Sequence, residues 1–123
     1  MKRDMDLIRR ITLATDELPP GKWLEEIEGV DPMVFAGHAT WMEEAGLIKA
    51  TITEYLDGGA AVAVKRLTWD GCEFADSIRS DTVWNKAKES VIKPASSFTF
   101  GILRDWLKAE IQQGLPTLRT IGQ

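Results

Sequence analysis

Residues 32–69 have the sequence PMVFAGHATWMEEAGLIKATITEYLDGGAAVAVKRLTW, and this stretch decides the fold. Asp31, just before it, favours the start of a helix, and Gly46 suits a left-handed cap at the end of that helix. From Ile48 the apolar residues recur at every second position, which is the period of a half-buried strand. Asp57-Gly58-Gly59 supplies a turn, after which a second strand returns. The stretch therefore predicts a helix followed by a β-hairpin.

An amphipathic helix and a short extended segment are predicted before this stretch. Asp4 can cap the helix. Apolar residues then recur at helical spacing, namely Leu7, Ile11, Ala14 and Leu18. Pro19-Pro20-Gly21 stops the helix, because proline cannot continue it. Residues 22–29 alternate weakly, which predicts a short strand, although a helical turn also fits.

Further helices are predicted after the hairpin. Thr68 can cap a helix that begins at Trp69, and Ser80-Asp81-Thr82 leaves open whether residues 69–92 form one helix or two. A last helix runs from Phe98 or Phe100 to Gln113. The order predicts an α+β fold, a winged helix-turn-helix-like domain with additional C-terminal helices. The predicted organisation is a winged-helix-like domain (1–92), a linker (93–97), a helix that packs on the same domain or dimerises (98–114) and a flexible tail (115–123).

Two local signatures support this fold. Residues 38–48 resemble the end of the recognition helix in arsenic-sensor-type and related bacterial repressors, with a histidine, a later apolar residue and Ala-Gly-Leu before a β-branched residue. Residues 67–74 resemble the Leu-Thr-x-x-Gly junction that follows the wing in many such domains. Both signatures concern packing and caps, so they indicate a fold and no ligand.

A resemblance to one family covers most of the chain. The opening residues 1–9, the central Ala45-Gly46-Leu47-Ile48 and the run 66–71 with Phe74 resemble an uncharacterised bacterial and prophage family, domain of unknown function family 2513. Further shared positions are Ile78, Arg79, Asp81, Val83 and Trp84. The resemblance implies a phage or mobile-element context and gives no functional residues to transfer. Ala39 stands where a larger apolar residue is expected.

Composition limits the class of protein. The 123 residues are 44% hydrophobic and 28% charged, which suits a globular chain large enough for a core. Cys72 is the single cysteine, so no intrachain disulfide and no cysteine-rich zinc site can form. No segment has the pattern of a signal peptide or a membrane helix. We expect a cytoplasmic protein with no cofactor and no membrane partner.

DNA binding is the first functional hypothesis. A non-catalytic, transcription-regulator-like module would place the helix after Asp31 in a major groove, where only His38 and Thr40 could contact base edges. Phosphate contacts would come from basic side chains of the N-terminus and the wing, namely Lys2, Arg3, Arg9, Arg10 and Lys65. A solvated helix start is the favoured explanation of the N-terminal cluster.

Charge opposes that hypothesis. The chain carries a formal net charge of −4, and residues 16–46 hold eight carboxylates against one lysine, a local charge of −7. Such a segment repels phosphates. Protein binding is therefore the alternative hypothesis, with a host protein or a second copy as partner. Trp23, Trp41 and Glu43 are the residues that we nominate for an exposed interaction surface.

An enzyme is the most distant alternative, and we expect no catalytic site. His38 is the only histidine, and nothing in the spacing brings it to Cys72. We expect His38 to pack or form local hydrogen bonds, Cys72 to be a small buried residue, and the five tryptophans to serve mainly as core anchors. The acidic run 25–31 matches no metal-binding loop, so we expect no metal site.

Overall fold

The computed structural model describes residues 1–94 and 99–114. The predicted tail and residues 95–97 of the predicted linker lie outside the described residues. The elements in chain order are α1 (Met5–Asp16), α2 (Pro32–Glu44), β1 (Ile48–Glu54), β2 (Ala60–Leu67), α3 (Trp69–Ile78), α4 (Asp81–Ala87), the π-helical η1 (Lys88–Ile92) and α5 (Phe100–Gly114). They form two compact units, residues 1–75 and 76–123. The mixed α+β class is confirmed.

Helix α1 begins where its cap was predicted. An Asp4 side-chain oxygen, Oδ1, accepts hydrogen bonds from the amides of Asp6 and Leu7, at 3.0 and 3.2 Å. The side chains of Leu7 and Ile11 are buried. The helix ends at Asp16, so Leu18 lies beyond it instead of completing the apolar stripe.

Helix α2 also has both predicted ends. Oδ1 of Asp31 accepts from the amides of Met33 and Val34, and Pro32 occupies the first turn, where its missing N–H costs nothing. After the helix, Gly46 has a φ of 80°, the left-handed conformation that glycine adopts freely. The buried face carries Phe35, Ala36, His38, Ala39 and Met42.

The short strand predicted for residues 22–29 is wrong, because the segment makes only one β-bridge. Leu24 exchanges both backbone hydrogen bonds with Val64, at 2.9 and 2.8 Å. Of the side chains in this segment only Ile27 is buried, and Glu25 and Glu26 are exposed. A strand with so little to bury gains too little to order its backbone along its length.

The β-hairpin forms as predicted, with one irregularity in β2. The register passes from Lys49↔Arg66 to Ala50↔Val64, which leaves Lys65 as the extra residue of a β-bulge. The bulge places two successive side chains, Lys65 and Arg66, on the exposed face, so that Leu67 again points into the core. At the tip of the hairpin the side chain of Leu56 is fully exposed.

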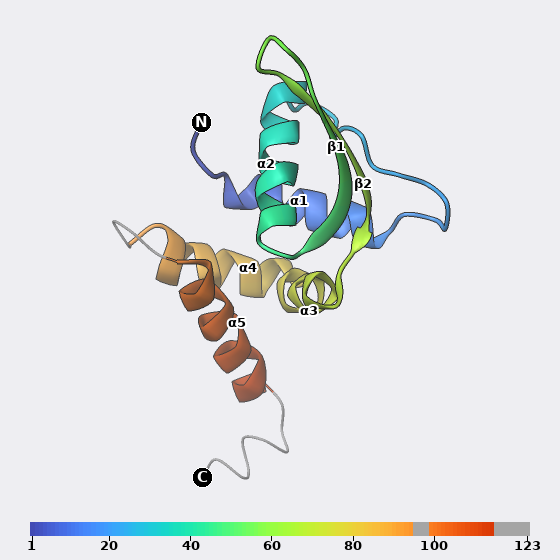
Figure 1. Cartoon of the computed structure of the whole chain (residues 1–123). Coiled ribbons are helices and arrows are strands. Elements are labelled where there is room, and N and C mark those ends of the chain that lie inside the picture. The colour runs from blue at the N-terminus through green and yellow to red at the C-terminus, as the bar shows by residue number, and fades with distance from the viewer. Residues whose placement is uncertain (95–98, 115–123) are drawn as a thin grey trace. The chain divides into compact units, whose positions relative to one another are not determined.

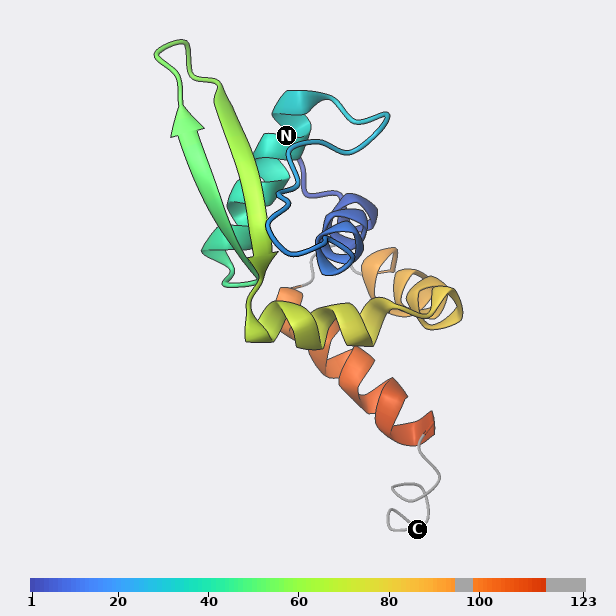
Figure 2. The same ribbon diagram turned by 90° about the vertical axis from the view of Figure 1, so that its right-hand side faces the viewer.

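The two helices and the hairpin of residues 1–75 form two layers. Figures 1 and 2 show α1 and α2 on the same side of the hairpin, with the tip of the hairpin projecting past the first turn of α2. The hairpin covers the buried face of α2, and β2 also contacts α1. The fully buried side chains between the layers include Ile11, Phe35, Met42, Ile48 and Val64.

Helix α3 is anchored to the end of α2 through Thr68 and Gly71. The Thr68 hydroxyl donates to the Gly46 carbonyl at 2.5 Å and accepts from the Gly71 amide at 3.0 Å. Gly71 lies so close to the preceding loop that a Cβ there would be 1.9 Å from the carbonyl oxygen of Leu47. The Thr-x-x-Gly signature is therefore a packing requirement.

Cys72 is exposed, so the prediction of a buried cysteine is wrong. The buried stripe of α3 contains Gly71, Phe74, Ala75 and Ile78. These positions follow the i, i+3, i+4, i+7 spacing of one helix face. Cys72 is one residue out of phase, which turns its side chain about 100° away from Gly71 toward solvent.

The second unit contains α4, η1 and α5. Ser80 Oγ accepts from the Val83 amide, so Ser80 caps a new helix and residues 69–92 form two helices followed by a π-helical segment. Trp84 is buried in this unit, as are Leu103 and Leu107 of α5. Lys86 and Glu110 join α4 to α5 through an ion pair of 3.1 Å.

Candidate functional site

The N-terminal residues lie across α2 and form a hydrogen bond with the histidine of that helix. His38 is completely buried, and its Nε2 accepts a hydrogen bond of 2.9 Å from the Asp4 amide. Because Nε2 is the acceptor, the proton of the neutral ring belongs on Nδ1, which donates to the Val34 carbonyl at 2.8 Å. Local hydrogen bonding was the expected role of His38, and neither ring nitrogen is left for a base edge.

Met1 and Thr40 complete this arrangement. The Met1 side chain lies against the glycine of α2, since a Cβ on Gly37 would be 2.2 Å from the Met1 methyl group. The Thr40 hydroxyl donates to the Ala36 carbonyl at 2.8 Å. Both side chains predicted to contact base edges, His38 and Thr40, therefore make hydrogen bonds within α2, although Thr40 remains half-exposed.

A hollow of about 470 Å³ lies between α2 and the tip of the hairpin. We call it the α2–hairpin groove. Its apolar lining comes from methionine, aromatic and aliphatic side chains, and its acidic lining comes from one glutamate of α2 and one of β1. The lining residues are Met1, Met33, Ala36, Gly37, Thr40, Trp41, Glu44, Ile52, Glu54, Tyr55, Gly58, Gly59 and Ala60. The lining contains no lysine or arginine.

Trp41 is one of the two aromatic residues that line this groove. Its ring meets the His38 ring edge-on, with centroids 5.2 Å apart. It also lines an adjoining shallow hollow with Arg3 and Glu44. Glu43, nominated together with Trp41, is half-exposed and does not line the groove.

Sequence reasoning missed Met33 and Tyr55, which are about half-exposed, at 53% and 54%. Met33, Gly37, Trp41 and Glu44 have the spacing of one helix face, so the sequence carried this signal. The contributions of Met1 and Tyr55 could not be found in the same way. Both depend on contacts between distant segments.

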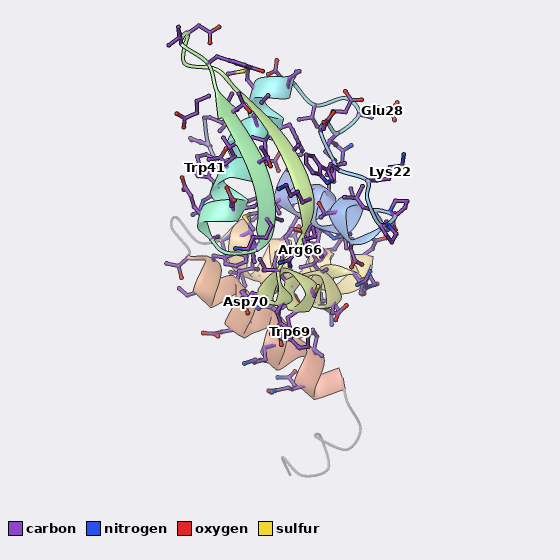
Figure 3. All side chains as sticks on the ribbon, turned by 45° about the vertical axis from the view of Figure 1, so that its right-hand side comes forward. Lys22, Glu28, Trp41, Arg66, Trp69 and Asp70 are labelled. Atoms are coloured by element: carbon purple, nitrogen blue, oxygen red, sulfur yellow. The ribbon has the colours of Figure 1, made fainter. Side chains whose placement is uncertain are left out.

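The predicted phosphate-binding residues do not form one cluster. Lys2 and Arg3 are exposed on the N-terminal arm, whereas Arg10 donates to the Glu28 carbonyl at 3.0 Å and Arg9 is half-buried in α1. Lys65 lies elsewhere, exposed near the end of β2, with its Nζ 5.0 Å from the ring centroid of Trp23. Figure 3 shows Trp41 on one side of the fold and Lys22, the neighbour of Trp23, on the other.

The tryptophans are not mainly core residues, contrary to the prediction. Only Trp84 is buried, while Trp23 and Trp69 are 50% and 79% exposed. Cys72 lines a hollow that does not include His38. Within residues 1–94 and 99–114 no helix has the length and apolarity needed to cross a membrane, and no three metal-ligating side chains are grouped.

Comparisons with known proteins identify one matching family. The model of the family described as hypothetical protein (DUF2513) matches residues 2–97. A protein of Haemophilus influenzae, described as uncharacterized, is 32% identical over an alignment that covers 94% of this chain and 99% of that relative. No solved structure matches the chain.

Proposed function

We propose that this chain, which belongs to the DUF2513 family, is a non-catalytic binding module that holds a protein partner in the α2–hairpin groove. In this proposal α2 and the hairpin take the places of the recognition helix and the wing of a winged-helix domain. The observation that carries it is the lining of the groove, which combines apolar and aromatic side chains with two carboxylates and lacks any lysine or arginine.

The apolar part of the groove suits a peptide side chain. Met33 and Tyr55 are half-exposed, and Trp41 lines the groove with them. Methionine adapts its shape to different partners, and tyrosine and tryptophan are the residues that most often dominate binding energy at interfaces. A partner that covers these three side chains removes apolar surface from water, which favours association.

The charged part of the groove selects the kind of partner. Glu44 and Glu54 line it without a basic neighbour from α2 or the hairpin. A segment that places a lysine or arginine between apolar residues would satisfy both carboxylates. A DNA duplex would instead bring phosphates toward them, and the buried His38 has no free nitrogen to offer a base. This face therefore favours a basic, apolar protein segment over DNA.

Peptide display on the purified full chain tests the proposal. We expect the selected peptides to combine large apolar residues with lysine or arginine. Amide shifts in NMR spectra should move at α2 and the hairpin tip. Trp41→Ala should weaken binding at least tenfold, since a large aromatic contact is lost. Glu44→Lys and Glu54→Lys should each weaken binding and raise its salt sensitivity.

Glu25→Lys is the matched control, because it makes the same charge change on an exposed residue outside the groove. It should leave peptide affinity within twofold of the parent chain. Selection of acidic peptides, or binding that Trp41→Ala does not weaken, contradicts the proposal. Sedimentation of the parent chain identifies the case in which the groove is filled by a second copy, since Trp41→Ala would then dissociate a dimer.

A further inference from the structure

A second surface, at the end of β2 beside the proline turn, is basic and shares no lining residue with the α2–hairpin groove. It contains Lys22, Lys49, Lys65 and Arg66, and we call these four residues the basic surface. We propose that the basic surface binds single-stranded nucleic acid, with phosphates on the four cations and a base against Trp23. The inference is independent of the protein partner proposed above.

Two structural features bring the four cations together. The Leu24–Val64 bridge carries Lys22 and Trp23 to the end of β2 that holds Lys65 and Arg66. The bulge at Lys65 then keeps both basic side chains of β2 exposed, and the register sets Lys49 of β1 directly opposite Arg66. Figure 3 shows Lys22 on the side of the fold away from Trp41 and Arg66 near the middle of the view, at the lower end of the hairpin.

The pairing of Lys49 with Arg66 is unfavourable for stability. Like charges directly opposite each other in an antiparallel pair repel and destabilise the pair. In the described part of the chain none of the four cations makes an ion pair, and Arg66 makes one hydrogen bond, to the Leu67 carbonyl. Costs of this kind are expected where a surface serves a ligand. An anion bound between Lys49 and Arg66 would convert the repulsion into attraction.

The hollow beside the basic surface supplies an aromatic face. It measures about 420 Å³ and is lined by Lys22, Trp23, Lys65 and Arg66, together with the proline turn, Cys72 and one carboxylate, Asp16. Lys65 lies over the Trp23 ring, and half of the Trp23 side chain remains exposed. Cations around an exposed aromatic ring are the arrangement that binds single strands, whose unpaired bases can stack. A duplex offers no free base to Trp23.

Fluorescence anisotropy with a labelled single-stranded oligonucleotide tests the inference at low salt. The parent chain should bind with an affinity that falls as salt rises. Lys49→Gln should reduce the slope of log affinity against log salt by about 0.7, the contribution of one phosphate contact on a single strand. Arg66→Glu should weaken binding at least tenfold. Trp23→Ala should weaken binding to the single strand and leave the weaker binding to a duplex unchanged.

Lys108→Glu in α5 is the control for net charge, because Lys108 is exposed and lies outside the basic surface. It should change affinity less than twofold. Arg66→Glu should also raise the urea midpoint of unfolding, since it replaces a repulsive pair with an attractive one, so lost binding cannot be attributed to lost structure. Equal losses for Lys108→Glu and Arg66→Glu, or no salt-dependent binding at low salt, would overturn the inference.

Discussion

The Asp4 amide donates a hydrogen bond to Nε2 of His38, a residue 34 positions further along the chain. The same aspartate caps α1 with its side chain, so one residue connects the start of α1 to the middle of α2. This connection holds the N-terminal arm against α2 and brings Met1 to the rim of the groove.

Replacement of His38 should separate the arm from α2. His38→Leu keeps an apolar side chain in the buried site but leaves the Asp4 amide without its acceptor, at a cost of about 2 kcal/mol. We expect a lower urea midpoint and faster hydrogen exchange at the Asp4 amide. Thr40→Val is the control: it removes the hydrogen bond from the Thr40 hydroxyl within α2 and should leave that exchange rate unchanged. An unchanged rate in His38→Leu would show that the arm is held by other contacts.

Gly71→Ala should strongly destabilise the first unit. The added methyl group would lie 1.9 Å from the Leu47 carbonyl oxygen, and that oxygen belongs to the backbone and cannot move aside. Overpacking of this kind costs about 3 kcal/mol. Denaturant unfolding of the variant and the parent chain should show this loss of stability. Cys72→Ala is the neighbouring control and should change stability by less than about 0.5 kcal/mol, because the cysteine is exposed. Equal stability of the two variants would contradict the close approach.

Gly37→Ala should stabilise the first unit, in contrast to Gly71→Ala. Alanine favours a helix interior over glycine by roughly 1 kcal/mol. The atom in its way is the methyl end of the flexible Met1 side chain, which can swing away. We expect a higher unfolding midpoint together with a shifted Met1 methyl signal in NMR spectra. Gly101→Ala in α5, which meets no close neighbour, should leave that signal in place. A destabilised Gly37→Ala chain would mean that Met1 is held rigidly.

Lys93 should control the acidity of Glu89. A side-chain hydrogen bond of 2.6 Å from Lys93, and then its charge, hold the pKa of Glu89 below the ordinary value near 4.5. The favourable interaction is therefore complete above pH 4.5 and is lost as pH falls through the lowered pKa of Glu89. Lys93→Gln should move the pKa of Glu89 toward 4.5 in a carboxyl-carbon NMR titration. Lys108→Gln, outside this pair, should not move it.

The sequence predicted the features that depend on neighbours along the chain. Asp4 and Asp31 cap helices as expected, and Gly46 takes the left-handed conformation expected after α2. Residues 22–29 alternate like a strand, yet their pairing depends on what they bury, and only Leu24 finds a partner in Val64. Local pattern could not supply that information.

The two candidate sites were harder to predict, because both are formed by residues that are far apart in the sequence. The spacing from Met33 to Glu44 marked one face of α2, but no periodicity indicates that Met1 lies on it. No glycine or proline marks the position of the bulge at Lys65 in the sequence. The pairing of Lys49 with Arg66 could therefore not be predicted. Of the eight carboxylates counted over residues 16–46 only Glu44 lines the groove, so the charge of the segment did not locate the site.

The extra residue in β2 means that the strand can lose one position without changing which side chains face the core. If Lys65 were deleted, Val64, Arg66 and Leu67 would alternate regularly, with Val64 and Leu67 inward and Arg66 outward. The buried face of the hairpin and the pairing of Lys49 with Arg66 would be kept, and the bulge and one of the four cations would be lost. Family members whose β2 is one residue shorter at this position should therefore keep the core of the hairpin and carry a less basic surface.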